Sequence, residues 1–189
     1  MKLGETYDLD GIDRQLLDEL QSDSKRSLKD IGAAVGLSAP SVMERVRKLE
    51  NAGIIKGYHA LLDARKVGLD ISAFIGVSIS NPPQLAAFET WVEAIPQILE
   101  CHHVTGGHTL LLKVKTRNTA DLEKLISRIR SMEGVASTET MVVLSTHTER
   151  VEVALPPHDS APDARRRKRA RRKSDTPRTL KASPTLEEA

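Results

Sequence analysis

The chain has 189 residues, of which 39% are hydrophobic and 29% are charged, as in a globular protein rather than a disordered or membrane chain. Its uninterrupted apolar runs are far shorter than the ~20 residues of a transmembrane helix, and the first ten residues lack the apolar stretch of a signal peptide. A single cysteine, Cys101, excludes an intramolecular disulfide, and we therefore expect a cytoplasmic protein.

The formal net charge of +2 is unevenly distributed along the chain. Residues 156–189 contain 10 of the 28 Lys and Arg residues and 5 of the 26 Asp and Glu residues, which gives this segment a charge of +5 and the remainder −3. A basic segment on a mildly acidic body indicates that contacts with a polyanion are concentrated at particular places.

Apolar spacing and capping residues predict two helices near the N-terminus. Residues 9–20 carry an apolar side chain at every third or fourth position, which is the pattern of an amphipathic helix. A second, shorter helix is predicted between Ser27, which begins a Ser-Leu-Lys-Asp capping box, and Gly36, the residue type that closes a helix.

A third helix is predicted from the N-cap Ser38 to Gly53, with Pro40 in its first turn. Apolar residues at i, i+4 and i+7 from Val42 define its buried face, and the run that follows, residues 54–58, is apolar and strand-like. Three short helices with a tight break between the second and third form the helix-turn-helix pattern, in which the third helix enters the major groove of DNA.

The outward face of this third helix is small at its leading end and basic farther along. This face, its flank at Arg45 and the N-cap supply our candidate DNA-binding residues: Ser38, Pro40, Ser41, Glu44, Arg45, Arg47 and Lys48. The leading end can approach base edges, where Glu44 can accept from a cytosine amino group, while the longer cations reach phosphates. The Ser38 end can hold a phosphate at the positive end of the helix dipole. On charge alone, a solvated surface helix explains these residues equally well.

The second half of the chain is predicted to be an α+β domain. The predicted elements are strands at residues 71–80, 98–105, 109–116 and 135–148 and helices around residues 85–95 and 122–129. The second and third strands form a hairpin. The order β-α-β-β-α-β is that of the ferredoxin-like split βαβ unit.

The tail, beyond the second domain, carries a dense basic run. Eight cations occupy ten positions: Arg165, Arg166, Arg167, Lys168, Arg169, Arg171, Arg172 and Lys173. Because the tail has no apolar periodicity, we expect it to be disordered, and we interpret these cations as a non-specific DNA-binding arm that neutralises phosphates. The alternatives are a solvated tail that only aids solubility and a nuclear-import signal.

Residues 37–58, with the sequence LSAPSVMERVRKLENAGIIKGY, strongly resemble the helix-turn-helix and following segment of the leucine-responsive/asparagine-synthase regulator family, Lrp/AsnC. The resemblance includes IDRQLLDELQSDSKRSLKDIGAAVGLS before this segment and HALLDARKVGLDISAF and ILECHHVTG after it, so it covers roughly residues 8–150. It implies a transcription regulator that binds double-stranded DNA in the cytoplasm, associated with the nucleoid. Its prokaryotic character argues against the nuclear-import interpretation.

The resemblance also implies a domain organisation and an assembly. We expect a winged-helix-like helix-turn-helix domain at residues 1–60, a linker at 61–70, a ferredoxin-like domain at 71–153 and a tail at 154–189. The ferredoxin-like domain of the family dimerises and assembles further into higher even-numbered oligomers. The same domain is the family's module for amino-acid effectors.

In relatives the effector binds near the hairpin turn, which reads approximately T-G-D-x-D. This chain has T-G-G-H-T there and lacks both acidic residues, which are the natural partners for a ligand's ammonium group. Backbone N–H groups of the two glycines can still bind a carboxylate, and the histidine can add a pH-dependent donor. A plain turn that needs its glycines for positive φ is the simpler alternative.

The candidate effector-binding residues are therefore those of the turn and, by family analogy alone, two threonines of the last strand: Thr105, Gly106, Gly107, His108, Thr109, Thr138 and Thr140. The only cofactor-like molecule that we expect is such an amino-acid effector. Four residues, Cys101, His102, His103 and His108, are of metal-ligating types. In a strand Cys101 and His103 share a face and His102 points away, so too few ligands converge for a structural zinc site, and no metal is predicted.

Two other classes of protein compete with an effector-responsive regulator. An enzyme is not predicted, because no nucleophile with a plausible base and no phosphate-binding glycine loop can be picked out. The stronger alternative is a chromatin-like architectural protein that binds and bends DNA broadly without an effector, which the basic tail favours.

Overall fold

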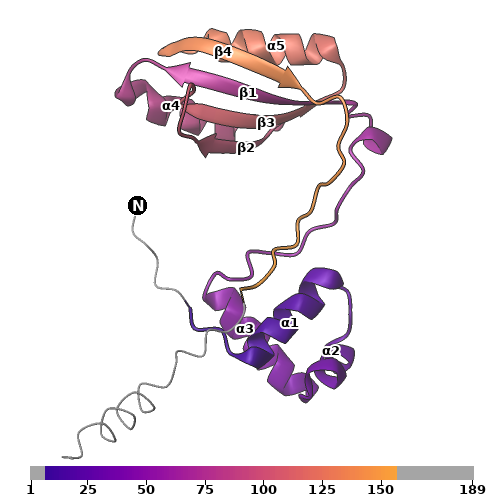
Figure 1. Cartoon of the computed structure of the whole chain (residues 1–189). Helices are drawn as coiled ribbons and strands as arrows, with labels where there is room; N and C mark the ends of the chain where they lie inside the picture. The colour runs from indigo at the N-terminus through magenta and orange to yellow at the C-terminus, as the bar shows by residue number, and fades with distance from the viewer. Residues whose placement is uncertain (1–6, 157–189) are drawn as a thin grey trace, which may run out of the picture. The chain divides into compact units, whose positions relative to one another are not determined.

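The computed structural model describes residues 7–156, which form two units (Figure 1). Among the described residues, the first unit comprises residues 7–58 and 151–156, and the second comprises residues 59–150. The last six described residues, three of which the sequence analysis assigns to the second domain, therefore belong with the first unit. No helix among residues 7–156 is long and apolar enough to cross a membrane.

The first unit contains three helices: α1 (Gly11–Ser22), α2 (Leu28–Val35) and α3 (Ala39–Asn51). Each helix begins where a side-chain oxygen accepts from the backbone N–H three residues later, and the acceptors belong to Asp10, Ser27 and Ser38. The two serine caps are those that the sequence predicts. The full reciprocal capping box lies at Asp10, whose backbone N–H is bound by the Asp13 side chain.

Two glycines make the turn between α2 and α3 tight. Gly36 has φ 73° and closes α2, as its residue type predicts. At Gly32 an added Cβ would lie 2.5 Å from the Leu37 carbonyl oxygen, so only glycine allows this close approach. The core beneath the turn is built from six buried residues of the three helices: Leu16, Leu17, Ile31, Val35, Val42 and Leu49.

The strand expected at residues 54–58 is absent from the described structure. The backbone N–H groups of Ile54 and Ile55 both donate to the Leu49 carbonyl oxygen, at 3.0 and 3.3 Å. These bonds close the C-terminal end of α3, with Gly53 at φ 70°. The expectation was wrong because the groups that a strand would use are already engaged by the helix.

The second unit has the predicted order β-α-β-β-α-β after a short 3-10 turn, η1 (Arg65–Val67). Its elements are β1 (Ile71–Ile79), α4 (Pro82–Glu93), β2 (Ile98–His103), β3 (Leu110–Thr116), α5 (Thr119–Arg130) and β4 (Val135–Val142). The strands form one antiparallel sheet in the order β2-β3-β1-β4, and both helices cover the same face (Figure 1). The ferredoxin-like fold is therefore confirmed.

Alternation along the strands separates a core face from an open face. Ala73, Ile75 and Val77 of β1 are buried against the helices, where Phe88 of α4 and Ile129 of α5 are fully buried. The residues between them in β1, with their partners on neighbouring strands, form the opposite side of the sheet, which we call the open face. No helix of the described residues covers the open face.

The last strand is shorter than predicted, because β4 ends at Val142 rather than at residue 148. Its partner β1 begins at Ile71, and the final bond of this pairing runs from the Val143 N–H to the Ser72 carbonyl oxygen at 2.9 Å. Beyond that point β4 has no partner strand in the described chain. Residues 143–149 instead run along the open face.

Candidate DNA-binding helix and ligand-binding turn

Helix α3 presents the predicted face of small and charged residues. Val42 and Leu49 are fully buried, whereas Pro40, Glu44 and Arg47 are exposed. The half-buried Ser41 lies in the cap, where its hydroxyl is 2.9 Å from the hydroxyl of the N-cap Ser38. The leading end of the helix is therefore compact and free of long side chains.

The charges along α3 are partly paired with one another. Lys48 and Glu44 form an exposed ion pair one helical turn apart, with 2.9 Å between Nζ and Oε1. The hydrogen bond between them lowers the pKa of Glu44 and raises the pKa of Lys48. Arg47 makes none of the ion pairs found within residues 7–156, so its guanidinium is available to an external anion.

Arg45 has a different position from the one expected of a DNA contact. Its Nη1 atom lies 2.7 Å from carboxylate oxygens of both Asp10 and Asp13, at the start of α1. These two bonds, with Asp10 the larger contributor, raise the pKa of Arg45. The side chain of Asp13 is only 10% exposed, so the guanidinium is the partner of a nearly buried carboxylate. Arg45 thus ties α3 to α1, and we remove it from the DNA-contacting set.

The hairpin turn between β2 and β3 places His108 on the open face. Gly106 has φ 118°, as expected for a turn that needs glycine. The His108 ring lies over Gly76 of β1, where an added Cβ would be 2.4 Å from the ring. Its Nε2 atom is 2.8 Å from a Glu139 carboxylate oxygen, and its Nδ1 atom is 3.4 Å from the Ser78 hydroxyl. The turn is thereby connected to β1 and β4.

The turn and the two threonines of β4 do not form one site. Thr138 and Thr140 pair with Val77 and Ile75 and therefore lie on the helix-covered face, where Arg130 of α5 donates to the Thr138 hydroxyl at 2.8 Å. His108 lies on the opposite face. The grouping proposed from family analogy is therefore corrected: Thr138 and Thr140 are separated from the turn by the sheet itself.

Sequence reasoning missed three residues of this site: Gly76, Ser78 and Glu139. Glu139 stands between the two threonines in the chain, and period-two alternation places it on the other face of β4. A glycine inside a strand signals close approach by another group, which is the role of Gly76. Both signals are present in the sequence, but neither names His108 as the partner.

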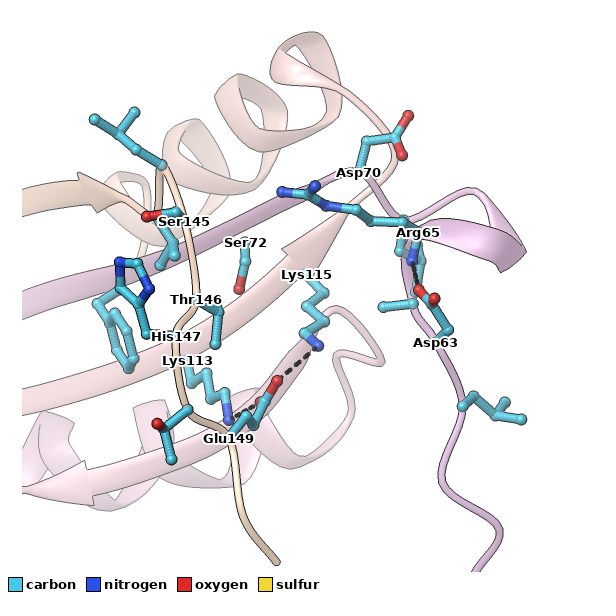
Figure 2. Close-up of a pocket in the computed structure, with 17 residues that line it drawn as sticks. Asp63, Arg65, Asp70, Ser72, Lys113, Lys115, Ser145, Thr146, His147 and Glu149 are labelled. Carbon is cyan, nitrogen blue, oxygen red and sulfur yellow. Dashed lines mark hydrogen bonds and ion pairs between the residues drawn. The ribbon is translucent and has the colours of Figure 1, made fainter.

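A groove of about 880 Å³ lies on the open face, between residues 62–70 and residues 143–149 (Figure 2). Figure 2 shows Lys113 and Lys115 reaching from β3 toward Glu149, with Nζ–oxygen distances of 2.8 and 3.9 Å. Lys113 also binds Glu100, at 3.1 Å. The hydrogen bond between Lys113 and Glu149 is the main cause of the lowered pKa of Glu149. The same bond is the main cause of the raised pKa of Lys113.

The cysteine and histidines of β2 alternate between the two faces as predicted. Cys101 is half-buried toward the helices, and burial raises the pKa of its thiol. His103 binds Glu89 of α4, whereas His102 binds Glu100, each at 3.0 Å. Residues 7–156 contain no group of three or more His, Cys, Asp or Glu residues arranged to hold a metal ion.

The basic run of the tail lies outside the described residues. It comprises Arg165, Arg166, Arg167, Lys168, Arg169, Arg171, Arg172 and Lys173. The described chain ends at Pro156, in the first unit.

Two family models match the two units. The AsnC-type helix-turn-helix domain matches residues 9–50, and the Lrp/AsnC ligand binding domain matches residues 72–153. Together they contain α1, α2, α3 without its last residue, and the sheet without the first residue of β1. The second description identifies the domain as one that binds ligands in this family.

Curated relatives match over most of their length. The chain is 33% identical over 147 residues to the HTH-type transcriptional regulator FL11 of Pyrococcus horikoshii, which covers 78% of this chain and 97% of that protein. It is 36% identical over 140 residues to the leucine-responsive regulatory protein of Escherichia coli K12, covering 72% and 85% of the two chains. Both names describe transcription regulators.

Solved structures show the same fold. A transcriptional regulator from Neisseria meningitidis, crystallised as a complex with L-methionine, matches with a TM-score of 0.73 and 28% identity over 77% of this chain and 96% of that one. The leucine response regulatory protein of Mycobacterium tuberculosis matches with a TM-score of 0.68 and 33% identity over 75% and 96%. The helix-turn-helix unit, the ligand-binding domain and these relatives together show that the chain belongs to the Lrp/AsnC family of DNA-binding transcription regulators.

Proposed function

We propose that this regulator recognises its operator through α3. The observation that carries the proposal is the face of α3, which is compact at its capped N-terminal end and presents Arg47 and Lys48 one to two turns later. A helix inserted in the major groove brings its leading residues to base edges and its longer cations to phosphates. Ser41 and Glu44 therefore read bases, and Arg47 and Lys48 bind the backbone. A DNA-binding regulator acts on the chromosome, which places the protein on the nucleoid in the cytoplasm.

Alanine variants of α3 test this assignment. Arg47→Ala weakens binding to operator and scrambled duplexes by the same factor, because phosphate contacts carry no sequence information. Glu44→Ala and Ser41→Ala change the ratio between the two duplexes, by about 1–3 kcal/mol for a good base contact. Binding titrations with both duplexes measure these effects, and Lys66→Ala, at an exposed lysine outside the helix, is the matched control.

Arg45→Ala distinguishes Arg45, which ties α3 to α1, from Arg47, which we assign to the DNA backbone. Removing it leaves the nearly buried Asp13 carboxylate without its cation, so the free energy of unfolding falls by about 2 kcal/mol. Urea denaturation measures this loss, which Arg47→Ala does not share. If the Ser41, Glu44 and Arg47 variants all fold and bind the operator like the parent, α3 is not the reading helix.

We also infer that the protein assembles as dimers, and as multiples of dimers, through the open face of its sheet. Phe74 lies half-buried on this face, and segments beside it expose Leu62 at 72% and Leu144 at 89%. An uncovered sheet face flanked by large apolar side chains is stabilised when a second copy covers it. A two-fold dimer then presents two copies of α3 to a two-fold-related operator.

We further propose an amino acid or a related small molecule as effector, bound beside the turn at residues 105–109. The match to the family's ligand binding domain and the L-methionine complex of the Neisseria meningitidis regulator support this class of ligand. The turn lacks a carboxylate, but Glu139 supplies one through its contact with His108 and is 64% exposed. Glu139 can pair with a ligand's ammonium group, and the N–H groups of Gly106 and Gly107 with its carboxylate.

An architectural protein without an effector is the second candidate. The observation in its favour is that Glu139 already has a partner, His108, at 2.8 Å. Such a protein binds operator and random duplexes with nearly equal affinity, whereas a regulator of defined genes discriminates between them by factors of about 10³ or more. The duplex titrations above therefore separate the two candidates.

A further inference from the structure

Met43 is the one large apolar side chain of α3 that stays outside the core of the first unit, counted over a helix that the structure describes in full. Val42 and Leu49 are fully buried, and Val46 packs against the same core. Met43 is instead 49% exposed. Because water surrounds so much of its apolar surface, a partner that covers Met43 gains the free energy of burying it.

Met43 lies on the face of α3 that points away from the core. Four exposed residues of this face stand at i, i+3, i+4 and i+7, the spacing of a single helical stripe: Pro40, Met43, Glu44 and Arg47. Pro40 is short, so Met43 and Glu44 are the first long side chains behind the capped N-terminal end. The leading residues of a helix in the major groove are the ones that contact base edges. A helix that reads DNA through this end therefore presents Met43 to the bases.

The two charged neighbours of Met43 on this stripe leave the apolar contact to it. Arg47 is one helical turn farther on, and we assign its guanidinium to a phosphate, which fixes how deeply the preceding turn enters the groove. Glu44 is a hydrogen-bond acceptor that is paired with Lys48 at 2.9 Å. With about 3.6 residues per turn, Met43 and Glu44 are about 100° apart around the helix axis, so they meet different bases.

The major groove of DNA presents one apolar group to such a side chain, the 5-methyl group of thymine. The polar groups of the base edges are hydrogen-bond donors and acceptors, for which a thioether is at best a weak partner. A methionine side chain is unbranched and has three rotatable bonds, so its sulfur and terminal methyl group adapt to the apolar surface that they meet. The chemistry of Met43 thus matches thymine rather than cytosine, adenine or guanine.

We propose that Met43 is a further specificity-determining residue, which recognises a thymine of the operator through its 5-methyl group. The contact is apolar, so it discriminates by the burial of the methyl group and not by a hydrogen bond. Its preference for thymine therefore adds to the preference that Glu44 gives at another base. This inference rests on the proposed reading of the operator by α3, and it adds a residue that neither charge nor hydrogen bonding singles out.

Replacing thymine by deoxyuridine tests the contact from the DNA side. The replacement removes the 5-methyl group and keeps every hydrogen-bonding group of the base. The full chain is titrated with an operator duplex that it selects from random DNA, and with duplexes in which each thymine in turn is replaced. We expect one sensitive thymine in each half-site. Loss of its methyl group weakens binding about fourfold, the factor that corresponds to one buried group of this size.

Three variants of Met43 test the contact from the protein side. Met43→Ala binds the operator about fourfold or more weakly and no longer distinguishes thymine from deoxyuridine at the sensitive position, because the two changes remove the same contact. Met43→Gln, of similar length but polar, also loses the distinction, whereas Met43→Leu keeps it. Leu99→Ala, at a 52% exposed leucine of β2, is the matched control and responds like the parent. Urea denaturation verifies that each variant is folded.

Two outcomes overturn the role of Met43. In the first, no thymine of the operator is sensitive to the loss of its methyl group. In the second, Met43→Ala remains as sensitive as the parent, which shows that the methyl group acts through another side chain or through the shape of the DNA. Failure of α3 as the reading helix is distinguishable, because Ser41→Ala and Glu44→Ala then also leave the ratio between operator and scrambled duplexes unchanged.

Discussion

At the scale of single residues, the contact between His108 and Glu139 is the centre of the proposed effector site. His108 fits only because Gly76 has no side chain beneath its ring. Glu139 lies beside it with more than half of its side chain exposed, and so restores a carboxylate that the turn itself lacks. The proposed site therefore has a carboxylate from β4 beside the turn, on the open face of the sheet.

Glu139→Gln tests this carboxylate as the partner of the effector's ammonium group. We expect about a tenfold or greater loss of affinity for the amino acid that the parent binds best, because a charge-assisted hydrogen bond is lost. Calorimetric titration with a panel of amino acids measures it. Glu123→Gln, at an exposed carboxylate on α5, is the control. Equal affinity of the parent and Glu139→Gln rules out this role, and a parent that binds no amino acid supports the architectural alternative.

At the scale of elements, Lys113 ties residues 143–149 to the sheet that they have left. Its bonds to Glu149 and Glu100 join three segments across the open face. The pKa of Glu149 is lowered chiefly by the hydrogen bond from Lys113. A carboxyl with a lowered folded pKa contributes stability above its unfolded value, about 4.3, and loses that contribution as the pH falls through the lower folded value.

Lys113→Met removes this tie. At pH 7 we expect the free energy of unfolding to fall by about 1 kcal/mol, a small value because Glu149 is half exposed. The difference from the parent shrinks below about pH 4 and vanishes once both Glu149 and Glu100, the two carboxyl partners of Lys113, are protonated in both states. Urea denaturation from pH 7 to pH 3 measures it, with Lys124→Met on α5 as the control. A difference that is constant over this range would contradict the role of the ion pair.

At the scale of the whole molecule, the open face leaves large apolar side chains exposed in a single copy. The segments beside it expose Leu62 and Leu144, and burial of one such side chain is worth about 1.5–3 kcal/mol. In a two-fold dimer the Leu62 and Leu144 side chains of both copies are buried, because a two-fold interface repeats every contact.

Leu144→Asp places a charge where we propose that the second copy packs. We expect the dimer to weaken at least about tenfold, since a carboxylate replaces a buried leucine in the interface. Sedimentation at micromolar concentration without DNA measures the change. Ala87→Asp adds the same charge on the exposed side of α4 and leaves the dimer intact. A parent that sediments as a monomer would refute the assembly, and with it the two-fold-related operator.

Local chemistry made much of the fold predictable. Ser27 and Ser38 cap the starts of α2 and α3, and Gly36 closes α2, because a cap depends on a few adjacent residues. Period-two and period-3.6 patterns likewise predicted the βαββαβ order, and the exposed face of α3 could be read from its apolar spacing. The amino-acid sequence by itself therefore determined the elements, their order and the helix that presents small and basic residues.

Contacts between distant residues were decided only by the tertiary structure. In the sequence, Arg45 is only a cation on the exposed flank of a helix. In the structure its guanidinium donates to Asp10 and Asp13, which lie more than thirty positions away along the chain. The ladder with β1 ends β4 at Val142, and the sheet separates Thr138 from His108. In each case the outcome depends on which residues of another element lie opposite. Packing, hydrogen bonding and charge pairing act through space rather than along the chain. Local periodicity therefore contains no information about which residue the partner is.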